Sequence, residues 1–78
     1  MDWRDRIESD PAICGGRPRV KGTRLTVEFL LGLKASGWSE AMILDSYAHL
    51  HEEDLRAVFA FAQSLIEEET FLAQPRVA

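Results

Sequence analysis

The hydrophobic positions in the second half of the chain recur with the period of an α-helix. Counting from Leu55, apolar side chains follow after three, four, seven, ten and eleven residues, the spacing that gathers them on one face of a helix. The acids Glu52 to Asp54 precede this stripe, where carboxylates meet the unpaired N–H groups of a first turn. The pattern predicts a long amphipathic helix that begins near residue 52. Its apolar stripe comprises Leu55, Val58, Phe59, Ala62, Leu65 and Ile66.

Two shorter helices are predicted ahead of the long one. Thr26 can cap a first helix, in which apolar residues from Val27 onward follow the helical spacing. Gly37 suits the position just after its end, because glycine adopts positive φ without strain. Ser39 can cap a second helix over residues 40–47.

Turn-forming residues divide the first 25 residues into short extended pieces. Asp10-Pro11 and Gly15-Gly16 are turn signals, and Pro18 lacks an N–H, which suits an edge strand. We therefore expect a mostly α fold: short N-terminal β-strands or a hairpin, then a three-helix unit with the outline of a helix-turn-helix. The predicted organisation is a single domain over residues 1–78, with an extended arm (1–25), the three-helix unit (26–69) and a tail (70–78).

Charge is unevenly distributed along a chain whose net charge is −4. Residues 1–34 carry seven bases against five acids, whereas residues 35–78 carry two bases against eight acids. Any contact with a polyanion is therefore expected in the N-terminal third. Four of the nine bases fall within residues 15–24, which contain no acid. They are Arg17, Arg19, Lys21 and Arg24.

The basic stretch favours a contact with DNA. An extended Arg-Pro-Arg segment, as in residues 17–19, fits a minor groove about 6 Å wide. On an extended backbone, alternate cations would also lie on one side. The alternatives are a hairpin with a solvated basic face and a strand that reaches an acidic partner. A phosphate-binding P-loop is excluded, because Lys21-Gly22-Thr23 has the wrong order. The DNA-facing candidates are Arg17, Arg19 and Lys21, followed by Arg24 and Arg56.

The long helix is a poor candidate for reading DNA bases. In a helix-turn-helix domain the last helix would lie in the major groove. Here its first residues are Glu52, Glu53 and Asp54, which would repel phosphates.

Other residues are candidates for contact with protein partners. Ala57 and Phe61 lie on a second side of the long helix, rich in small residues, which we interpret as a dimer seam. For Phe61, a place in the core is the alternative. In the tail, Phe71 and Leu72 could dock on a partner protein or fold back on the domain.

Size and composition indicate a binding protein. A chain of 78 residues makes one domain with a thin core, which proteins of this size often complete by pairing with another chain. No apolar run reaches the roughly 18 residues of a membrane span. The single cysteine, Cys14, cannot form an internal disulfide, so we expect a cytoplasmic location.

His49-Leu50-His51 lacks a third metal ligand, and Cys14 lacks a nearby histidine. We predict no metal, no cofactor, no small-molecule substrate and no enzymatic activity.

Several separated motifs resemble those of the domain-of-unknown-function family 433 (DUF433). The resemblance spans residues 7 to about 62 and rests on residues 7–18, 20–24, 35–40 and 47–55. It implies a small winged or homeodomain-like helix-turn-helix fold, expected as a homodimer or higher oligomer. Many members are antitoxins of the VapB-like type, expected to neutralise a PIN-like ribonuclease toxin and to repress their own operon by binding operator DNA. The alternative is a protein-protein interaction adaptor that binds no DNA.

The same resemblance gives part of the basic stretch a structural role. Gly16 belongs to the family pattern and would serve a turn. Gly22 permits positive φ, and Thr23 can form local hydrogen bonds. Arg24 could then pair with an acid such as Asp10.

Overall fold

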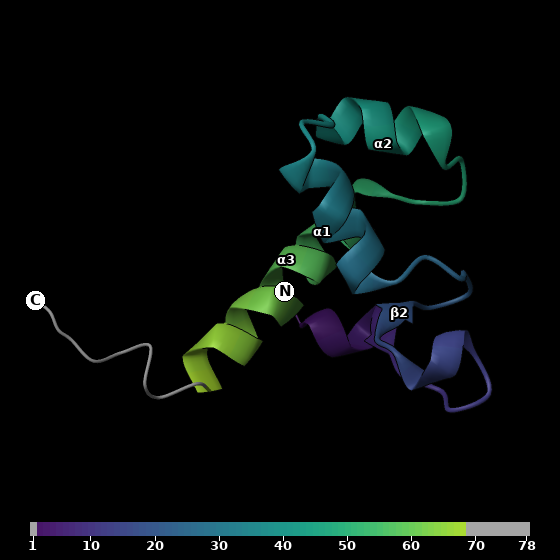
Figure 1. Cartoon of the computed structure of the whole chain (residues 1–78), viewed down its shortest axis with the longest axis vertical. Helices are drawn as coiled ribbons and strands as arrows, with labels where there is room; N and C mark the ends of the chain where they lie inside the picture. The colour runs from purple at the N-terminus through teal and green to yellow at the C-terminus, as the bar shows by residue number, and fades with distance from the viewer. Residues whose placement is uncertain (1, 69–78) are drawn as a thin grey trace, which may run out of the picture.

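Three α-helices follow a two-stranded antiparallel sheet in the computed structural model, which describes residues 2–68 (Figure 1). The mostly α fold with paired N-terminal strands is therefore confirmed. The candidates Phe71 and Leu72 lie outside the described residues. In chain order the elements are the 3-10 helix η1 (Trp3–Asp5), β1 (Ile7–Glu8), the 3-10 helix η2 (Cys14–Gly16), β2 (Arg19–Val20), α1 (Val27–Ala35), α2 (Glu40–Ser46) and α3 (Glu52–Glu68).

The two shorter helices begin where their caps were predicted. The Thr26 hydroxyl accepts a hydrogen bond from the Phe29 N–H at 3.0 Å, and the Ser39 hydroxyl accepts one from the Met42 N–H at 3.1 Å. Each cap satisfies one of the N–H groups that a helix start leaves without an intrahelical partner.

Helix α1 ends in a Schellman motif. Gly37 has φ of +99°, and its N–H donates to the Lys34 carbonyl at 3.0 Å. The Trp38 N–H donates to the Leu33 carbonyl at 3.0 Å. Both bonds satisfy carbonyls that the helix end leaves free, and the left-handed residue that they require is the predicted glycine.

The strands are short and their pairing is non-local. Ile7 lies opposite Val20, and Glu8 lies opposite Arg19. Between them the chain forms η2, where Cys14 has φ of +54° and Gly16 has φ of +81°. The sequence had predicted only extended pieces and turns here, and neither η1 nor η2 was foreseen.

The core lies where all the longer elements meet. Apolar side chains of both strands, of each helix and of the connection before α3 are buried together. The hairpin therefore contributes to the core and is no free arm beside a three-helix unit. The buried apolar residues are Ile7, Val20, Val27, Leu30, Ile43, Leu50, Leu55, Ala57 and Val58.

Two side-chain contacts hold the N-terminal residues against α3. The ring of Trp3 packs edge-on against Phe61, with centroids 4.7 Å apart. Arg6 Nη1 donates to Asp54 Oδ1 at 2.9 Å. The other oxygen of this buried carboxylate accepts the His51 N–H at 2.8 Å, so Asp54 also caps the start of α3.

Candidate nucleic-acid interface

Arg19 lies inside the fold and not on the surface. The residue is 5% exposed. Its Nη2 donates to Glu8 Oε2 at 2.6 Å, and its Nη1 donates to the Thr23 carbonyl at 2.9 Å. The prediction that Arg19 faces DNA alongside Arg17 and Lys21 is therefore wrong. The register of the sheet places Arg19 opposite an acid of β1, which takes up the guanidinium.

Arg17 remains on the surface but has an acidic neighbour. Its Nη1 lies 3.1 Å from Glu28 Oε1 of α1, and both side chains are exposed. An ion pair in water contributes little, typically 0 to about 1 kcal/mol. A phosphate could therefore compete with this carboxylate for Arg17.

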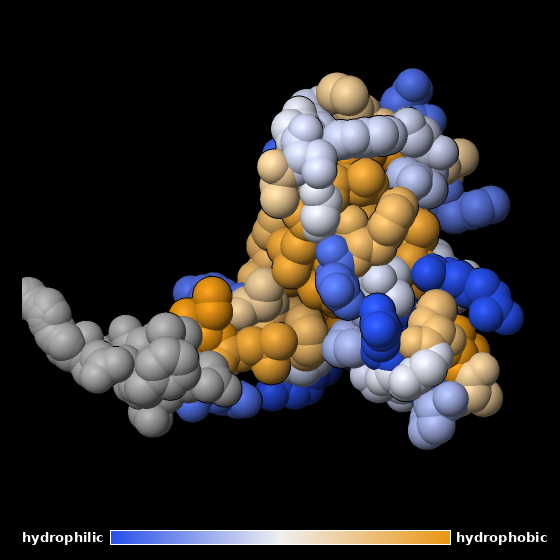
Figure 2. Space-filling view, viewed as in Figure 1, coloured by the Kyte–Doolittle hydropathy of each residue, from blue (hydrophilic) through white to orange (hydrophobic). Residues whose placement is uncertain are grey.

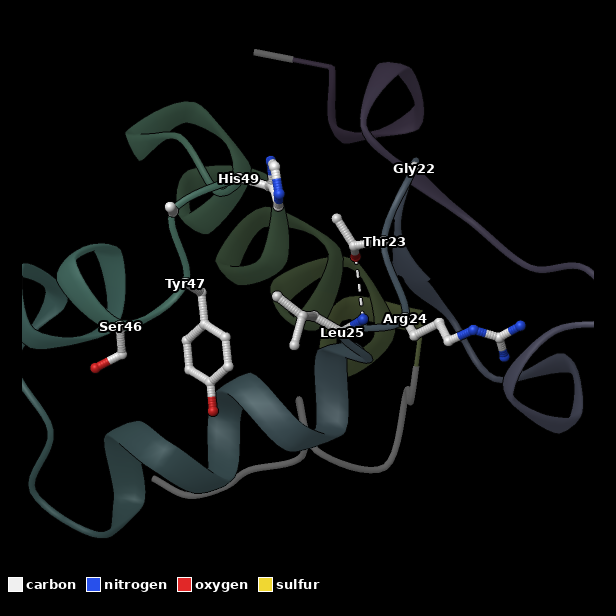
Figure 3. A pocket seen from close by; sticks show the side chains of 8 residues that line it. Gly22, Thr23, Arg24, Leu25, Ser46, Tyr47 and His49 are labelled. Carbon is white, nitrogen blue, oxygen red and sulfur yellow. Dashed lines mark hydrogen bonds between the residues drawn. The ribbon is translucent and has the colours of Figure 1, made fainter.

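Lys21 and Arg24 are the two cations of residues 15–24 that have no acidic partner among the described residues. Both are exposed, and neither forms an ion pair with another residue between 2 and 68. The expected pairing of Arg24 with Asp10 is not formed. Instead, the Asp10 carboxylate accepts the Ala12 N–H at 2.9 Å. The Arg24 side chain extends outward from the chain (Figure 3).

The turn that carries these two cations is held by local hydrogen bonds. Gly22 has φ of +79°. The Thr23 hydroxyl donates to the Val20 carbonyl at 2.8 Å. It also accepts the Leu25 N–H at 3.0 Å, the bond that is drawn in Figure 3. These bonds fix the backbone conformation of the turn that carries Lys21 and Arg24. Gly22 and Thr23 thus have the structural role that was inferred for them.

An open hollow separates this turn from the connection between α2 and α3. It measures about 360 Å³ and lies between residues 22–25 and 46–49 (Figure 3). A second hollow of about 490 Å³ adjoins it and is lined by Lys21, His49 and His51, together with Asp5, Arg6 and Asp54. The turn between β2 and α1 thus borders two open hollows, and the one beside Lys21 is lined by basic and acidic side chains.

The start of α3 presents acids to solvent, as the sequence indicated. Glu52 and Glu53 are exposed. Arg56, a further DNA candidate, lies one turn on, with its Nη2 3.6 Å from Glu52 Oε2. This face of α3 would be repelled by a phosphate backbone, so any contact with DNA is better served by the turn between β2 and α1.

The two described candidates for a protein contact have different surroundings. Ala57 is 0% exposed, so the prediction that it lies at a dimer seam is wrong. It was misplaced because the small-residue side of α3 packs inward on the chain's own core. Phe61 is only half-buried, and it lines an apolar hollow of about 280 Å³ between α1 and α3. The other lining residues are Pro18, Val27, Glu28, Leu31 and Leu65.

Residues 2–68 contain neither a cluster of metal ligands nor a helix suited to span a membrane. No three His, Cys, Asp or Glu side chains of this part of the chain come together as a metal site would require. None of the helices described there is long and apolar enough to cross a membrane.

Comparisons with known proteins agree on one family. The model of the family described as "Protein of unknown function (DUF433)" matches residues 7–62. The fold is similar to the crystal structure of a DUF433 member protein from Anabaena variabilis, with a TM-score of 0.77 and 29% sequence identity. The match covers 91% of this chain and 71% of that chain. No curated protein matches. The family match extends over more than half of the sequence, and the chain therefore belongs to the DUF433 family.

Proposed function

We propose that the chain is a non-enzymatic, DNA-binding regulator of the antitoxin type, which contacts operator DNA through the turn between β2 and α1. The proposal rests on one observation, the exposure of two unpaired cations, Lys21 and Arg24. Both cations are exposed, and neither is paired with an acid among the described residues. They stand on a turn that Gly22 and Thr23 hold in shape, so little further ordering is needed when they meet a phosphate.

The proposed contact is mainly electrostatic. Lys21 and Arg24 would neutralise backbone phosphates, and Arg17 would join them by exchanging Glu28 for a phosphate oxygen. Each neutralised phosphate contributes about 0.9 to the slope of log K against log salt concentration. Two to three contacts per chain correspond to a slope of roughly −2 to −3. Repression of its own operon would follow if the bound site overlaps the promoter.

A double variant, Lys21→Ala with Arg24→Ala, tests this proposal. We expect weaker binding to the DNA upstream of the chain's own gene, and a salt slope shallower by about 2, because two phosphate contacts are lost. Fluorescence anisotropy at several salt concentrations measures both quantities. Arg4→Ala is the control, since it removes an exposed cation of η1 and leaves the turn intact. Equal affinities for the double variant and the unaltered chain would remove the turn from the mechanism.

A second candidate function, binding of a partner protein, is favoured by the apolar hollow between α1 and α3. Leu31, Phe61 and Leu65 line it, and Leu65 is 47% exposed. An apolar side chain of another protein could bury itself here. In the antitoxin account that protein is a PIN-like ribonuclease toxin, which the chain would neutralise. In the adaptor account it is the chain's only partner.

Joint expression with the product of the adjoining gene tests this second candidate. We expect Leu65→Asp to abolish co-purification, because it brings a charge into the hollow. Met42→Asp is a matched control on α2, since Met42 is 49% exposed and lies outside the hollow. Loss of the partner in both variants, or in neither, would contradict a role for the hollow.

A further inference from the structure

A further hollow adjoins the turn between β2 and α1, beside η2. It measures about 350 Å³ and is lined by Ile13, Arg19, Gly22, Thr23 and Arg24. The Sγ of Cys14, the first residue of η2, lies 3.6 Å from the Arg24 carbonyl oxygen, so the turn and η2 are in contact here. Strongly hydrophilic side chains project from the molecule where β2 leads into α1, at the right of the view (Figure 2).

The charge of this hollow is positive. Two of the described residues that line it are bases, and none of them is an acid. Arg19 lines it from within the fold, and its charge is offset by Glu8, whose Oε2 lies 2.6 Å from Nη2. Arg24 is exposed and has no such partner among residues 2–68. The remaining charge of Arg24 therefore favours an anion.

Arg19 also brings an unsatisfied hydrogen-bond donor to the hollow. Its Nη1 and Nη2 donate to the Thr23 carbonyl and to Glu8. Its Nε, in contrast, is buried and has no hydrogen-bond partner within the described part of the chain. A buried donor without an acceptor is costly, so an acceptor that enters the hollow beside Arg19 would be stabilised.

The turn supplies two backbone donors as well. Neither the Gly22 N–H nor the Arg24 N–H donates to an acceptor within residues 2–68. Gly22 has φ of +79°, and a Cβ added there would meet nothing within 4 Å. A turn with a residue in the left-handed region can direct neighbouring N–H groups towards one anion, and glycine lets that anion approach the backbone closely.

We propose that this hollow binds a phosphate group. The phosphate oxygens accept hydrogen bonds from the Arg24 guanidinium and from the N–H groups of Gly22 and Arg24, with the Arg19 Nε as a further donor. A phosphate accepts bonds from several directions, and the planar fork of arginine matches its geometry. The site deepens the proposed contact with DNA, and it rests on that function only for the source of the phosphate, which is either the DNA backbone or a free phosphate.

Titration of the full chain with inorganic phosphate, followed by heteronuclear NMR, tests the site without DNA. The amides of Gly22 and Arg24 and the Nε–H of Arg19 should shift saturably, and sodium chloride at equal ionic strength should not reproduce the shifts. Arg24→Gln should raise the Kd for phosphate about tenfold, because a charge-assisted bond is lost. Ile13→Glu should abolish binding, since it adds an acid to the lining and removes no cation. Unchanged amide signals of α3 would show that both variants are folded.

Lys21→Ala is the matched control, because Lys21 is an exposed base that does not line this hollow. It should change the Kd for inorganic phosphate by less than about twofold, although it should weaken DNA binding. This difference separates the phosphate site from the proposed function as a whole.

A duplex of the DNA upstream of the chain's own gene distinguishes the sources of the phosphate. Shifts of the same three N–H signals by the duplex would support the site and assign its phosphate to the DNA backbone. Shifts by inorganic phosphate alone would support a site for free phosphate and contradict the DNA contact. No saturable shift with inorganic phosphate would overturn the site, even if the duplex binds through Lys21. An equal Kd for Ile13→Glu and the unaltered chain would overturn it too.

Discussion

Arg19 joins three parts of the molecule through one guanidinium group. It pairs with Glu8 of β1, stands on β2, and donates to the Thr23 carbonyl of the turn that leads to α1. Its Nε is buried without a hydrogen-bond partner among the described residues. The alternation of cations around Pro18 predicted that they lie on one side of an extended backbone. It did not predict that the Arg19 side chain is buried. The acid that takes it up lies eleven residues away and is brought near only by strand pairing.

We expect Arg19→Ala to destabilise the fold by about 2 to 3 kcal/mol, because the charge-assisted bonds and the packing of the buried stem are lost. Lys21→Ala, two residues further on and exposed, should change stability by less than about 0.5 kcal/mol. Urea denaturation measures both values. Equal losses would contradict the division of this stretch into an interior and a surface cation.

Asp54 is a second interior charge with two partners. We expect Asp54→Ala to cost about 2 kcal/mol, since it removes the cap on the His51 N–H and leaves Arg6 without its carboxylate. Glu53→Ala, exposed in the same turn, is the control and should cost much less. Thermal unfolding of the two variants checks the difference. A larger effect at Glu53 would contradict the role given to Asp54.

The helices were predictable because their determinants are local. Thr26, Ser39 and Gly37 set helix ends through groups within four residues of themselves, and α3 was visible in the spacing of its apolar residues. The strands β1 and β2 have two residues each and exist only as a pair. Nothing in such short segments shows their register, so the element that buries Arg19 could not be foreseen.

Two glycines, one within α1 and one just after its end, form a matched pair for substitution. Gly37 has φ of +99°, and we expect Gly37→Ala to destabilise by about 1 kcal/mol because an L-residue is strained there. Gly32 lies within α1, where an added Cβ meets nothing within 4 Å. Gly32→Ala should stabilise by roughly 0.5 to 1 kcal/mol. Opposite shifts of the urea midpoint would show this. The same sign for both would contradict the Schellman end of α1.

On the scale of the whole molecule, the surface is divided by charge and by packing. Three exposed cations, Arg17, Lys21 and Arg24, lie in or beside the turn between β2 and α1, whereas the first turn of α3 presents acids. The charge imbalance in the sequence indicated this division correctly. Which cations reach the surface depended on the tertiary fold, and so did the separation of the α3 stripe into a buried first half and an exposed second half.

The fastening of Trp3 and Arg6 to α3 affects how the chain can fold while it is being synthesised. Arg6 and Asp54 are 48 positions apart, so Arg6 leaves the ribosome well before its partner is synthesised. Until α3 emerges, β1 and β2 have little apolar surface to bury, and the nascent hairpin remains open to proteases and to other nascent chains. Synthesis of α3 is therefore the step that lets β1 and β2 bury their apolar side chains in the core.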